Sequence, residues 1–428
     1  MNPDGAVSRG LDHERIEVMG SSDHEALGLY LSIPFCRSKC TYCNFASGVY
    51  PASEHARYVE RLIEDLAGAG EWAARIGAEL PRLVDTVYLG GGTPSLLEPA
   101  LFERLFRAIR REFDVRADAE ITMECAPGQL AEEWLAALAS AGVNRVSLGV
   151  QSFIDGEAAM SGRLHTREIV LRDIYRLRDA GISNLNVDLI AGLAGQTIES
   201  WEESLDCLID CGAPHASIYM LEVDEDSRLG RELLAHGTRY RAGLVPCDEA
   251  IVEMYSLAIE RLAAAGIEQY EISNFARRGF ESKHNLRYWQ RRPYLGVGLD
   301  ASSMLRGADS SGNNVPPAVL RATATDDLNA YLDSRFEMKP EWLSVEQQHE
   351  EAWFLGLRLN AGVEIAPIER EFGPEKAGEA MTKAARLADA GLLNMDGGIV
   401  RLTARGRLLS NEVFQEFVEL TLATAATA

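Results

Sequence analysis

Short runs of apolar and β-branched residues alternate, over the first half of the chain, with longer stretches whose apolar residues recur every three or four positions. The short runs predict buried strands, and the longer stretches predict amphipathic helices. Six strands are expected, at 29–35, 84–90, 120–125, 145–151, 184–191 and 216–223. Strands alternating with helices indicate a parallel α/β sheet, which here is either doubly wound or a partial (β/α)6 barrel.

Polar and glycine-rich residues follow the ends of these predicted strands. They are the cysteines after residue 35, the run Gly90-Gly91-Gly92-Thr93, Glu124, Gln151 and Asp188. In parallel α/β folds, loops converge and ligands bind at this carboxyl edge. The placement therefore favours the partial barrel, with a ligand site at this edge.

The pattern changes along the chain and predicts four parts. Residues 1–26 are polar and predict a loosely attached tail, and residues 27–265 form the predicted barrel. Residues 266–343 hold an aromatic segment (269–304) and a polar connection (306–342). Residues 344–428 predict a smaller α+β domain. This last part has helical patterns at 345–358, 375–391 and 404–420 and a predicted hairpin at 392–402. Helices followed by a hairpin resemble a winged helix, but the hairpin has one basic residue, which argues against DNA binding.

Composition narrows the possible partners. The 428 residues are 46% hydrophobic and 25% charged, typical of a globular protein, and the formal net charge is -23. This charge repels phosphate backbones and anionic membranes, so no nucleic-acid partner is expected. The sequence has no apolar run of the ~20 residues that a membrane-spanning helix needs, and its start does not resemble a signal peptide. We therefore expect a cytoplasmic protein without an integral membrane segment.

Three of the seven cysteines, Cys36, Cys40 and Cys43, fall within eight positions. Thiolates suit iron-sulfur clusters and zinc, and closed sites of both kinds take four protein ligands. Only three are local here, so one iron of a cluster would stay open to a small molecule. A zinc knuckle or a redox group remains the alternative.

This spacing, with Tyr42 before the last cysteine, resembles the signature of the radical-SAM superfamily. In that superfamily S-adenosylmethionine (SAM) binds the open iron of a 4Fe-4S cluster, so the resemblance implies such a cluster on the three cysteines. It also implies SAM contacts at matching positions, namely Tyr30, Tyr42, Gly91, Gly92, Thr93, Glu124, Gln151, Arg163 and Asp188. The residues themselves predict close backbone approach and free N–H groups in the glycine loop, and a carboxylate for ribose hydroxyls at Glu124.

The runs SLGVQSF, NVDLIAGL and HNLRYW extend the resemblance over residues 29–304, to the group around oxygen-independent coproporphyrinogen III oxidase. That oxidase has a further cysteine two residues after the cluster motif, where this chain has Phe45. The HemW-type haem chaperones lack it and carry a motif that this chain matches with His284, Asn285, Tyr288 and Trp289. A neutral imidazole can ligate haem iron, and Tyr and Trp offer flat apolar surface to a porphyrin. The resemblance thus implies a haem site with His284 as the leading axial ligand.

We therefore expect a haem chaperone that binds haem, carries a SAM-ligated 4Fe-4S cluster and transfers haem to an unidentified acceptor protein. The alternatives are radical oxidative decarboxylation of coproporphyrinogen III and radical modification of haem. An electron donor such as a flavodoxin or ferredoxin is implied if SAM is cleaved.

The chain departs from the family pattern at two positions. Ala126 stands in Cys125-Ala126-Pro127-Gly128 where the family has an Asn-Pro-Gly run, and Ser302 stands where related sequences carry a histidine. Both changes are expected near the pocket, where they would alter haem affinity or SAM turnover.

Overall fold

The computed structural model describes residues 26–222, 225, 227–308, 316–333 and 338–418. Residues 1–25 of the expected tail, and Val223 at the end of the sixth predicted strand, lie outside these. The six strands are β1 (Leu27–Ile33), β3 (Leu83–Gly91), β4 (Asp114–Cys125), β5 (Arg145–Gln151), β6 (Asn184–Ala191) and β7 (His215–Met220). They lie side by side in chain order and every pair is parallel, which confirms the predicted arrangement.

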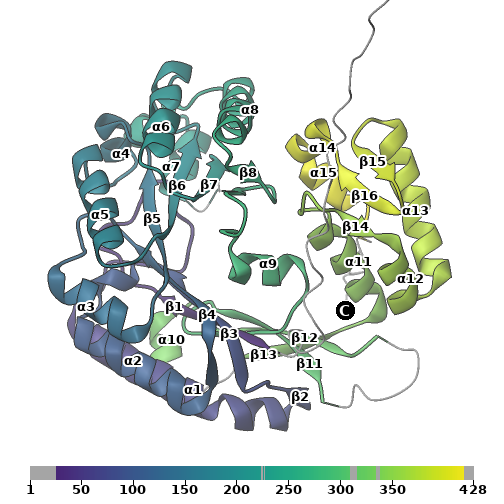
Figure 1. The fold of residues 1–428 in the computed structure, drawn as a ribbon, viewed down its shortest axis with the longest axis horizontal. Helices are drawn as coiled ribbons and strands as arrows, with labels where there is room; N and C mark the ends of the chain where they lie inside the picture. The colour runs from purple at the N-terminus through teal and green to yellow at the C-terminus, as the bar shows by residue number, and fades with distance from the viewer. Residues whose placement is uncertain (1–25, 223–224, 226, 309–315, 334–337, 419–428) are drawn as a thin grey trace, which may run out of the picture.

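Amphipathic helices cover the outer face of this curved sheet (Figure 1). They are α1 (Ser53–Arg75), α2 (Pro99–Glu112), α3 (Glu132–Ala141), α4 (Asp155–Met160), α5 (Arg167–Asp179), α6 (Ile198–Asp210) and α8 (Asp248–Ala264). Shorter turns connect them, at η1 (Pro94–Leu96), α7 (Arg228–Leu234) and η2 (Arg239–Leu244). The outer helices predicted from the three- and four-residue spacing are therefore present.

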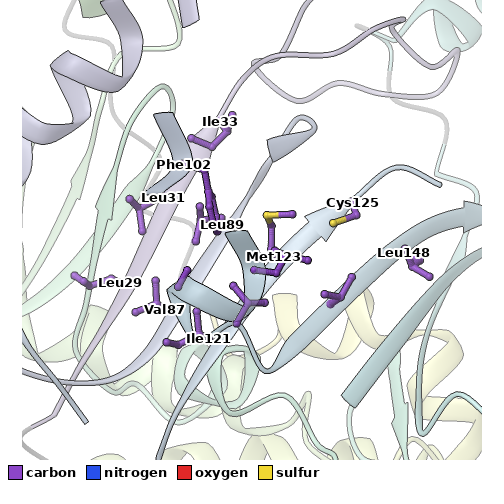
Figure 2. Close-up of a cluster of buried hydrophobic side chains, with 14 of the residues drawn as sticks. Leu29, Leu31, Ile33, Val87, Leu89, Phe102, Ile121, Met123, Cys125 and Leu148 are labelled. Carbon is purple, nitrogen blue, oxygen red and sulfur yellow. The ribbon is translucent and has the colours of Figure 1, made fainter. Parts of the chain in front are cut away.

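The main core lies between the sheet and these helices. Alternate side chains of a strand point to opposite faces, and Figure 2 shows the outward set from β1, β3 and β4 packed with Phe102 of α2. Leu29, Val87 and Met123 of this set are fully buried. The residues between them, such as Tyr88 and Glu124, face the inside of the curve. This two-sided pattern places polar chemistry inside a partial barrel.

The segment after α8 enlarges the sheet at both edges. β8 (Glu268–Gln269) and β9 (Asn274–Ala276) extend it antiparallel beyond β7, whereas β10 (Tyr294–Val297) pairs parallel with β1. Between β9 and β10, α9 (Lys283–Trp289) lies inside the curve (Figure 1). The sheet therefore has a seventh parallel strand, β10. The sequence did not predict it, because its apolar run is short and is interrupted by Gly296.

The structure also differs from the polar connection expected at 306–342. β11 (Ser302–Gly307), β12 (Val319–Thr323) and β13 (Lys339–Leu343) continue the sheet antiparallel from β10. The two-residue β2 (Ala78–Glu79) pairs with β11, and α10 (Leu328–Asp333) contacts α1. β11 and β12 are short, and β13 is mostly exposed and contains a proline, so the composition of this segment resembles that of a loop.

The C-terminal part has its own core and a three-stranded sheet. Its elements are α11 (Val345–Gly356), β14 (Val363–Glu364), α12 (Ile365–Phe372), α13 (Pro374–Asp389), β15 (Leu393–Asp396), β16 (Ile399–Leu402), α14 (Ala404–Leu408) and α15 (Ser410–Gln415). The predicted hairpin is present and turns on Gly397 and Gly398, both at positive φ. The last expected helix is instead two short ones that meet at Leu409, and β14 and α12 were not predicted.

This part joins the barrel through a β-bridge between Glu271 and Leu359, and Asn360 donates its backbone N–H to the Tyr270 carbonyl at 3.0 Å. Throughout the described residues, no helix combines the length and apolar character needed to cross a bilayer.

Candidate cofactor and ligand site

The loop after β1 carries the three clustered cysteines, all free and partly buried. The Cys36 N–H donates to the Gly48 carbonyl at 2.8 Å, and the Lys39 ammonium donates to the carbonyls of Phe45 and Ser47 at 2.7 and 2.9 Å. The loop is thus folded tightly on itself. It presents three thiols from one turn at the carboxyl end of β1.

The donor set fits a cluster better than a single ion. Among the described residues, no three His, Cys, Asp or Glu side chains converge as a single-ion site. A structural zinc site takes four protein ligands, one more than this loop supplies. In a 4Fe-4S cluster each thiolate ligates its own iron, so the three sulfurs need not meet at one point.

A neighbouring segment holds the cysteine loop in place. Thr41 donates its N–H to the Ser161 carbonyl at 3.2 Å, and the Ser38 hydroxyl donates to the Gly162 carbonyl at 3.1 Å. Arg163, next in the chain, donates from Nη2 to the Tyr42 hydroxyl at 3.3 Å. Two expected SAM contacts far apart in the sequence are therefore neighbours beside the cysteines.

The glycine loop after β3 binds the cysteine loop rather than offering free amides. The N–H groups of Gly92 and Thr93 donate to the carbonyls of Ile33 and Phe35 at 2.9 and 2.8 Å. The expectation of free N–H groups is wrong for both residues, because the pairing of β1 with β3 continues to their ends. A Cβ at residue 92 would lie 2.7 Å from the Ile33 oxygen, so this approach requires glycine.

Glu124 is a positioned carboxylate on the inner face of β4. It accepts from the Tyr88 hydroxyl at 2.8 Å and from the backbone N–H of Gly91. Burial raises its pKa to about 7, opposed by the Tyr88 hydrogen bond and increased by the charge of Asp188. Sequence reasoning missed Tyr88, although its place two residues before Gly90 on the inward set was a usable signal.

Gln151 and Asp188 lie at the ends of the next strands. Gln151 has a left-handed φ of 70°, and a Cβ built on Gly149 would lie 3.2 Å from its Nε2 and 2.9 Å from Nη2 of Arg163. Asp188 accepts from the Ser147 hydroxyl at 3.0 Å and from Asn186 Nδ2 at 2.7 Å, and burial raises its pKa. A left-handed non-glycine residue costs about 1–3 kcal/mol, and such strain clusters at functional sites.

Arg163 carries a further sign of a binding site. Its Nε is buried and has no hydrogen-bond partner among the described residues. Buried polar atoms without partners are rare in folded proteins and often mark a missing ligand or ion. The expected SAM residues therefore share one edge of the barrel, with hydrogen-bonding capacity left over.

The helix that carries the expected haem motif is anchored inside the barrel. Glu120 of β4 accepts the N–H groups of Lys283 and His284 at 3.0 Å each. His284 is 1% exposed, with Nδ1 2.9 Å from the Thr86 hydroxyl and Nε2 2.8 Å from the Tyr288 hydroxyl. Burial, followed by the charges of two arginines, lowers its pKa well below the usual value. The imidazole is neutral, as haem ligation requires, but both its nitrogens have partners.

The four residues of this motif do not converge on one point. Asn285 donates its N–H to the Ser282 hydroxyl at 3.3 Å at the start of α9. Trp289 faces the C-terminal part, where the Arg358 guanidinium lies 4.3 Å from the centroid of its ring. Its indole Nε1 is buried and lacks a partner among the residues described. Tyr288 instead faces the inner side of β1.

A cavity of about 310 Å³ joins the two sets of expected residues. Its lining is Tyr30, Ser32, Phe45, Ala46, Gly91, Tyr288, Tyr294, Leu299, Asp300 and Ser302. Tyr30 and Gly91 are expected SAM contacts, and Tyr288 belongs to the haem motif. Phe45 is 65% exposed at the rim. Ser302 lines the cavity as expected, whereas Ala126, partly buried after β4, is not among the lining residues.

Comparison with known families gives two matches. The radical-SAM superfamily matches residues 30–208, and the HemN C-terminal domain matches residues 343–409. A solved structure of the coproporphyrinogen III oxidase HemN from Escherichia coli superposes with a TM-score of 0.76, covering 92% of this chain and 90% of that one. At 24% identity, this likeness shows a shared fold.

Curated relatives match at higher identity. A protein named heme chaperone HemW from Lactococcus lactis is 35% identical over 91% of this chain and 96% of its own length. The protein of the same name from Bacillus subtilis is 35% identical over 91% of this chain and 98% of its own. That from Escherichia coli is 33% identical over 72% and 76%. The chain therefore belongs to the radical-SAM superfamily and, within it, to the HemW family.

Proposed function

We propose that this protein is a haem chaperone, which binds haem and passes it to an acceptor protein while carrying a SAM-ligated 4Fe-4S cluster. Radical-SAM membership implies the cluster and SAM. The relatives that span most of the chain are named for haem chaperoning. The observation that carries the proposal is a cavity whose lining includes both the expected SAM contacts Tyr30 and Gly91 and the haem-motif residue Tyr288.

The walls of this cavity suit a flat, largely apolar ligand. Tyr30, Tyr288, Tyr294 and Phe45 contribute aromatic surface, with Asp300 among the few polar groups. The volume falls at the lower end of the range usual for small-molecule sites, about 300–1,000 Å³. Phe45 presents a ring where the oxidase has a thiol, which favours binding a porphyrin over radical chemistry on it.

The cluster and SAM occupy the adjoining edge of the barrel in this proposal. Cys36, Cys40 and Cys43 hold three irons, and SAM, when bound, supplies the ligands of the fourth. Glu124 accepts hydrogen bonds from the ribose hydroxyls, since a carboxylate has room for more donors than Tyr88 and Gly91. Further contacts come from Tyr42, Gly92, Thr93, Gln151, Arg163 and Asp188.

His284 is the proposed axial ligand of the haem iron. Its Nε2 has to exchange the Tyr288 hydroxyl for the metal, since that hydroxyl lies 2.8 Å away. Asn285 holds the first turn of α9, and Trp289 fixes the helix against Arg358. In this proposal the motif supplies one haem ligand, His284, and the residues that hold its helix in place.

The proposed setting is the cytoplasm. A flavodoxin or ferredoxin supplies electrons if SAM is cleaved, and the winged-helix-like part, 344–428, serves as a cap or as a surface for the acceptor.

Titration of haem into the protein with its cluster reconstituted anaerobically tests the proposal. We expect saturable binding with a defined Soret band, altered in His284→Ala and unchanged in His236→Ala, a matched change at an exposed histidine. An unaltered spectrum in His284→Ala would remove the axial-ligand role, and absence of saturable binding would remove the chaperone function.

A second experiment separates this function from that of the oxidase. Anaerobic incubation with coproporphyrinogen III, SAM and a reductant should leave the porphyrinogen intact. Accumulation of protoporphyrinogen IX would instead assign oxidative decarboxylation to this site. Loss of haem under the same conditions would assign haem modification.

A further inference from the structure

Tyr88 lies on the inner face of β3, between the two halves of the site. Its hydroxyl donates to Glu124 Oε1 at 2.8 Å. Its ring stacks on the imidazole of His284, with centroids 5.2 Å apart and planes 26° from parallel. One side chain therefore touches both the carboxylate assigned to SAM and the histidine assigned to haem.

The contacts continue from His284 to the cavity. His284 Nε2 lies 2.8 Å from the hydroxyl of Tyr288, which lines the cavity beside Tyr30. His284 Nδ1 is held at the same time by the Thr86 hydroxyl, at 2.9 Å. Glu124, Tyr88, His284 and Tyr288 form an unbroken line of contacts, in which one ring stack joins two hydrogen bonds.

The side chains around Tyr88 are closely packed. A Cβ built on Gly90 would come within 2.8 Å of Glu124 Oε1 and 2.9 Å of Tyr88 Cε1. Glycine at residue 90 is therefore what lets the tyrosine and the carboxylate lie together. In so close a packing, a shift of Glu124 cannot be absorbed locally and passes to Tyr88.

We propose that Tyr88 is a positioning residue that couples occupancy of the SAM site to the haem affinity of the cavity. When Glu124 accepts hydrogen bonds from a ribose, the carboxylate turns towards the ribose. The Tyr88 hydroxyl, which donates to Glu124 Oε1, follows it, and the Tyr88 ring moves against His284. Because the Tyr288 hydroxyl is hydrogen-bonded to His284, this movement changes the position of that hydroxyl in the cavity wall. The inference rests on the proposed function for both ligands, and linkage makes the effect reciprocal, so haem changes SAM affinity by the same factor.

Tyr88→Phe tests this coupling because it removes the hydroxyl and keeps the stacked ring. Haem is titrated into the cluster-loaded protein with and without SAM, with the cluster kept oxidised so that SAM is not consumed. In the native protein we expect SAM to change the haem Kd by about fivefold or more, the usual size of such couplings. In Tyr88→Phe we expect a change below about twofold, with an unchanged Soret band.

Tyr331→Phe is the matched control. The Tyr331 hydroxyl also donates to a carboxylate, that of Asp65, at 2.5 Å, but on the outer layer between α10 and α1. The control loses the same kind of hydrogen bond and should keep the full effect of SAM. An equal loss of coupling in both variants would trace the effect to general weakening of the fold and overturn the proposal.

Two other outcomes overturn the proposal while leaving haem binding intact. One is a haem Kd in the native protein that is the same with and without SAM, and the other is undiminished coupling in Tyr88→Phe. Failure of the native protein to bind haem at all would instead overturn the proposed function, so the two failures are distinguishable.

Discussion

Leu89 and Tyr88 are neighbours in β3, yet they serve opposite faces of the sheet. Leu89 is fully buried among the apolar residues of β1, β4 and α2 (Figure 2), whereas Tyr88 faces a carboxylate and an imidazole. The outer face is apolar, and its side chains fill the space beneath the helices. The inner face has buried atoms without partners among the described residues, including Thr122 Oγ1 and Arg145 Nε. One face of the sheet therefore stabilises the fold, and the other holds binding chemistry at a cost in stability.

The largest expected effect comes from breaking the outer face. Phe102 of α2 is fully buried, with its ring centroid 4.7 Å from that of Phe106 and 5.1 Å from that of Trp134. Phe102→Ala leaves a cavity and should lower the free energy of unfolding by about 3–5 kcal/mol, measured by urea denaturation. Leu164→Ala, at a residue 67% exposed, should change it by less than about 0.5 kcal/mol. Equal losses would show that the outer core does not dominate stability.

Glu124→Gln tests the cost in stability of the polar inner face. The pKa of Glu124 is raised from 4.5 to about 7, so its proton binds more tightly in the folded protein. Its contribution to stability is therefore present below pH 4.5 and lost as the pH rises towards 7. Without SAM, the variant should match the native protein at pH 4.5 and exceed its free energy of unfolding by up to about 3 kcal/mol at pH 8.

Urea denaturation at both pH values measures this difference. Asp65, whose pKa burial raises to about 6, titrates in both proteins and cancels in the comparison. The same variant should bind SAM at least about tenfold more weakly, because hydrogen bonds to a charged group are each worth about 1.5–3 kcal/mol. A stability difference independent of pH would contradict the assignment of the raised pKa to Glu124.

Gly90→Ala probes the close contact on the inner face. The added methyl group would meet Glu124 and Tyr88 at less than 3 Å, so we expect a loss of about 1–3 kcal/mol in the free energy of unfolding. Thermal unfolding of the native protein and the variant measures it. An unchanged midpoint would mean that the inner face has room to rearrange.

Gly70→Ala is the smallest expected change and has the opposite sign. Gly70 is an exposed position within α1, and a Cβ there would meet nothing within 4 Å. Alanine favours the helix over glycine by about 0.5–1 kcal/mol, so the midpoint of thermal unfolding should rise. A fall would indicate that α1 contacts something at this position.

The six central strands and the cysteine loop could be predicted from the sequence, because each has its signal within a few residues. The seventh parallel strand could not, since Tyr294–Val297 is short and gains its identity only by pairing with β1. The partners of His284 were equally out of reach, because Thr86 and Glu120 are distant in the chain. Free amides in the glycine loop were a wrong prediction for the same reason, since the carbonyls that accept them belong to β1 and the residues after it.

The pairing of β1 with β10 constrains the order in which parts of the sheet can form during synthesis of the chain. β1 leaves the ribosome among the first strands, but one of its edges stays open until Tyr294–Val297 has been synthesised. Contacts between such distant segments form late in folding. The three cysteines follow β1 directly, although the hydrogen bonds of their loop are made to residues that precede β10 in the chain. We therefore expect a truncated chain ending before residue 294, which leaves one edge of β1 unpaired, to acquire iron less completely than the full chain.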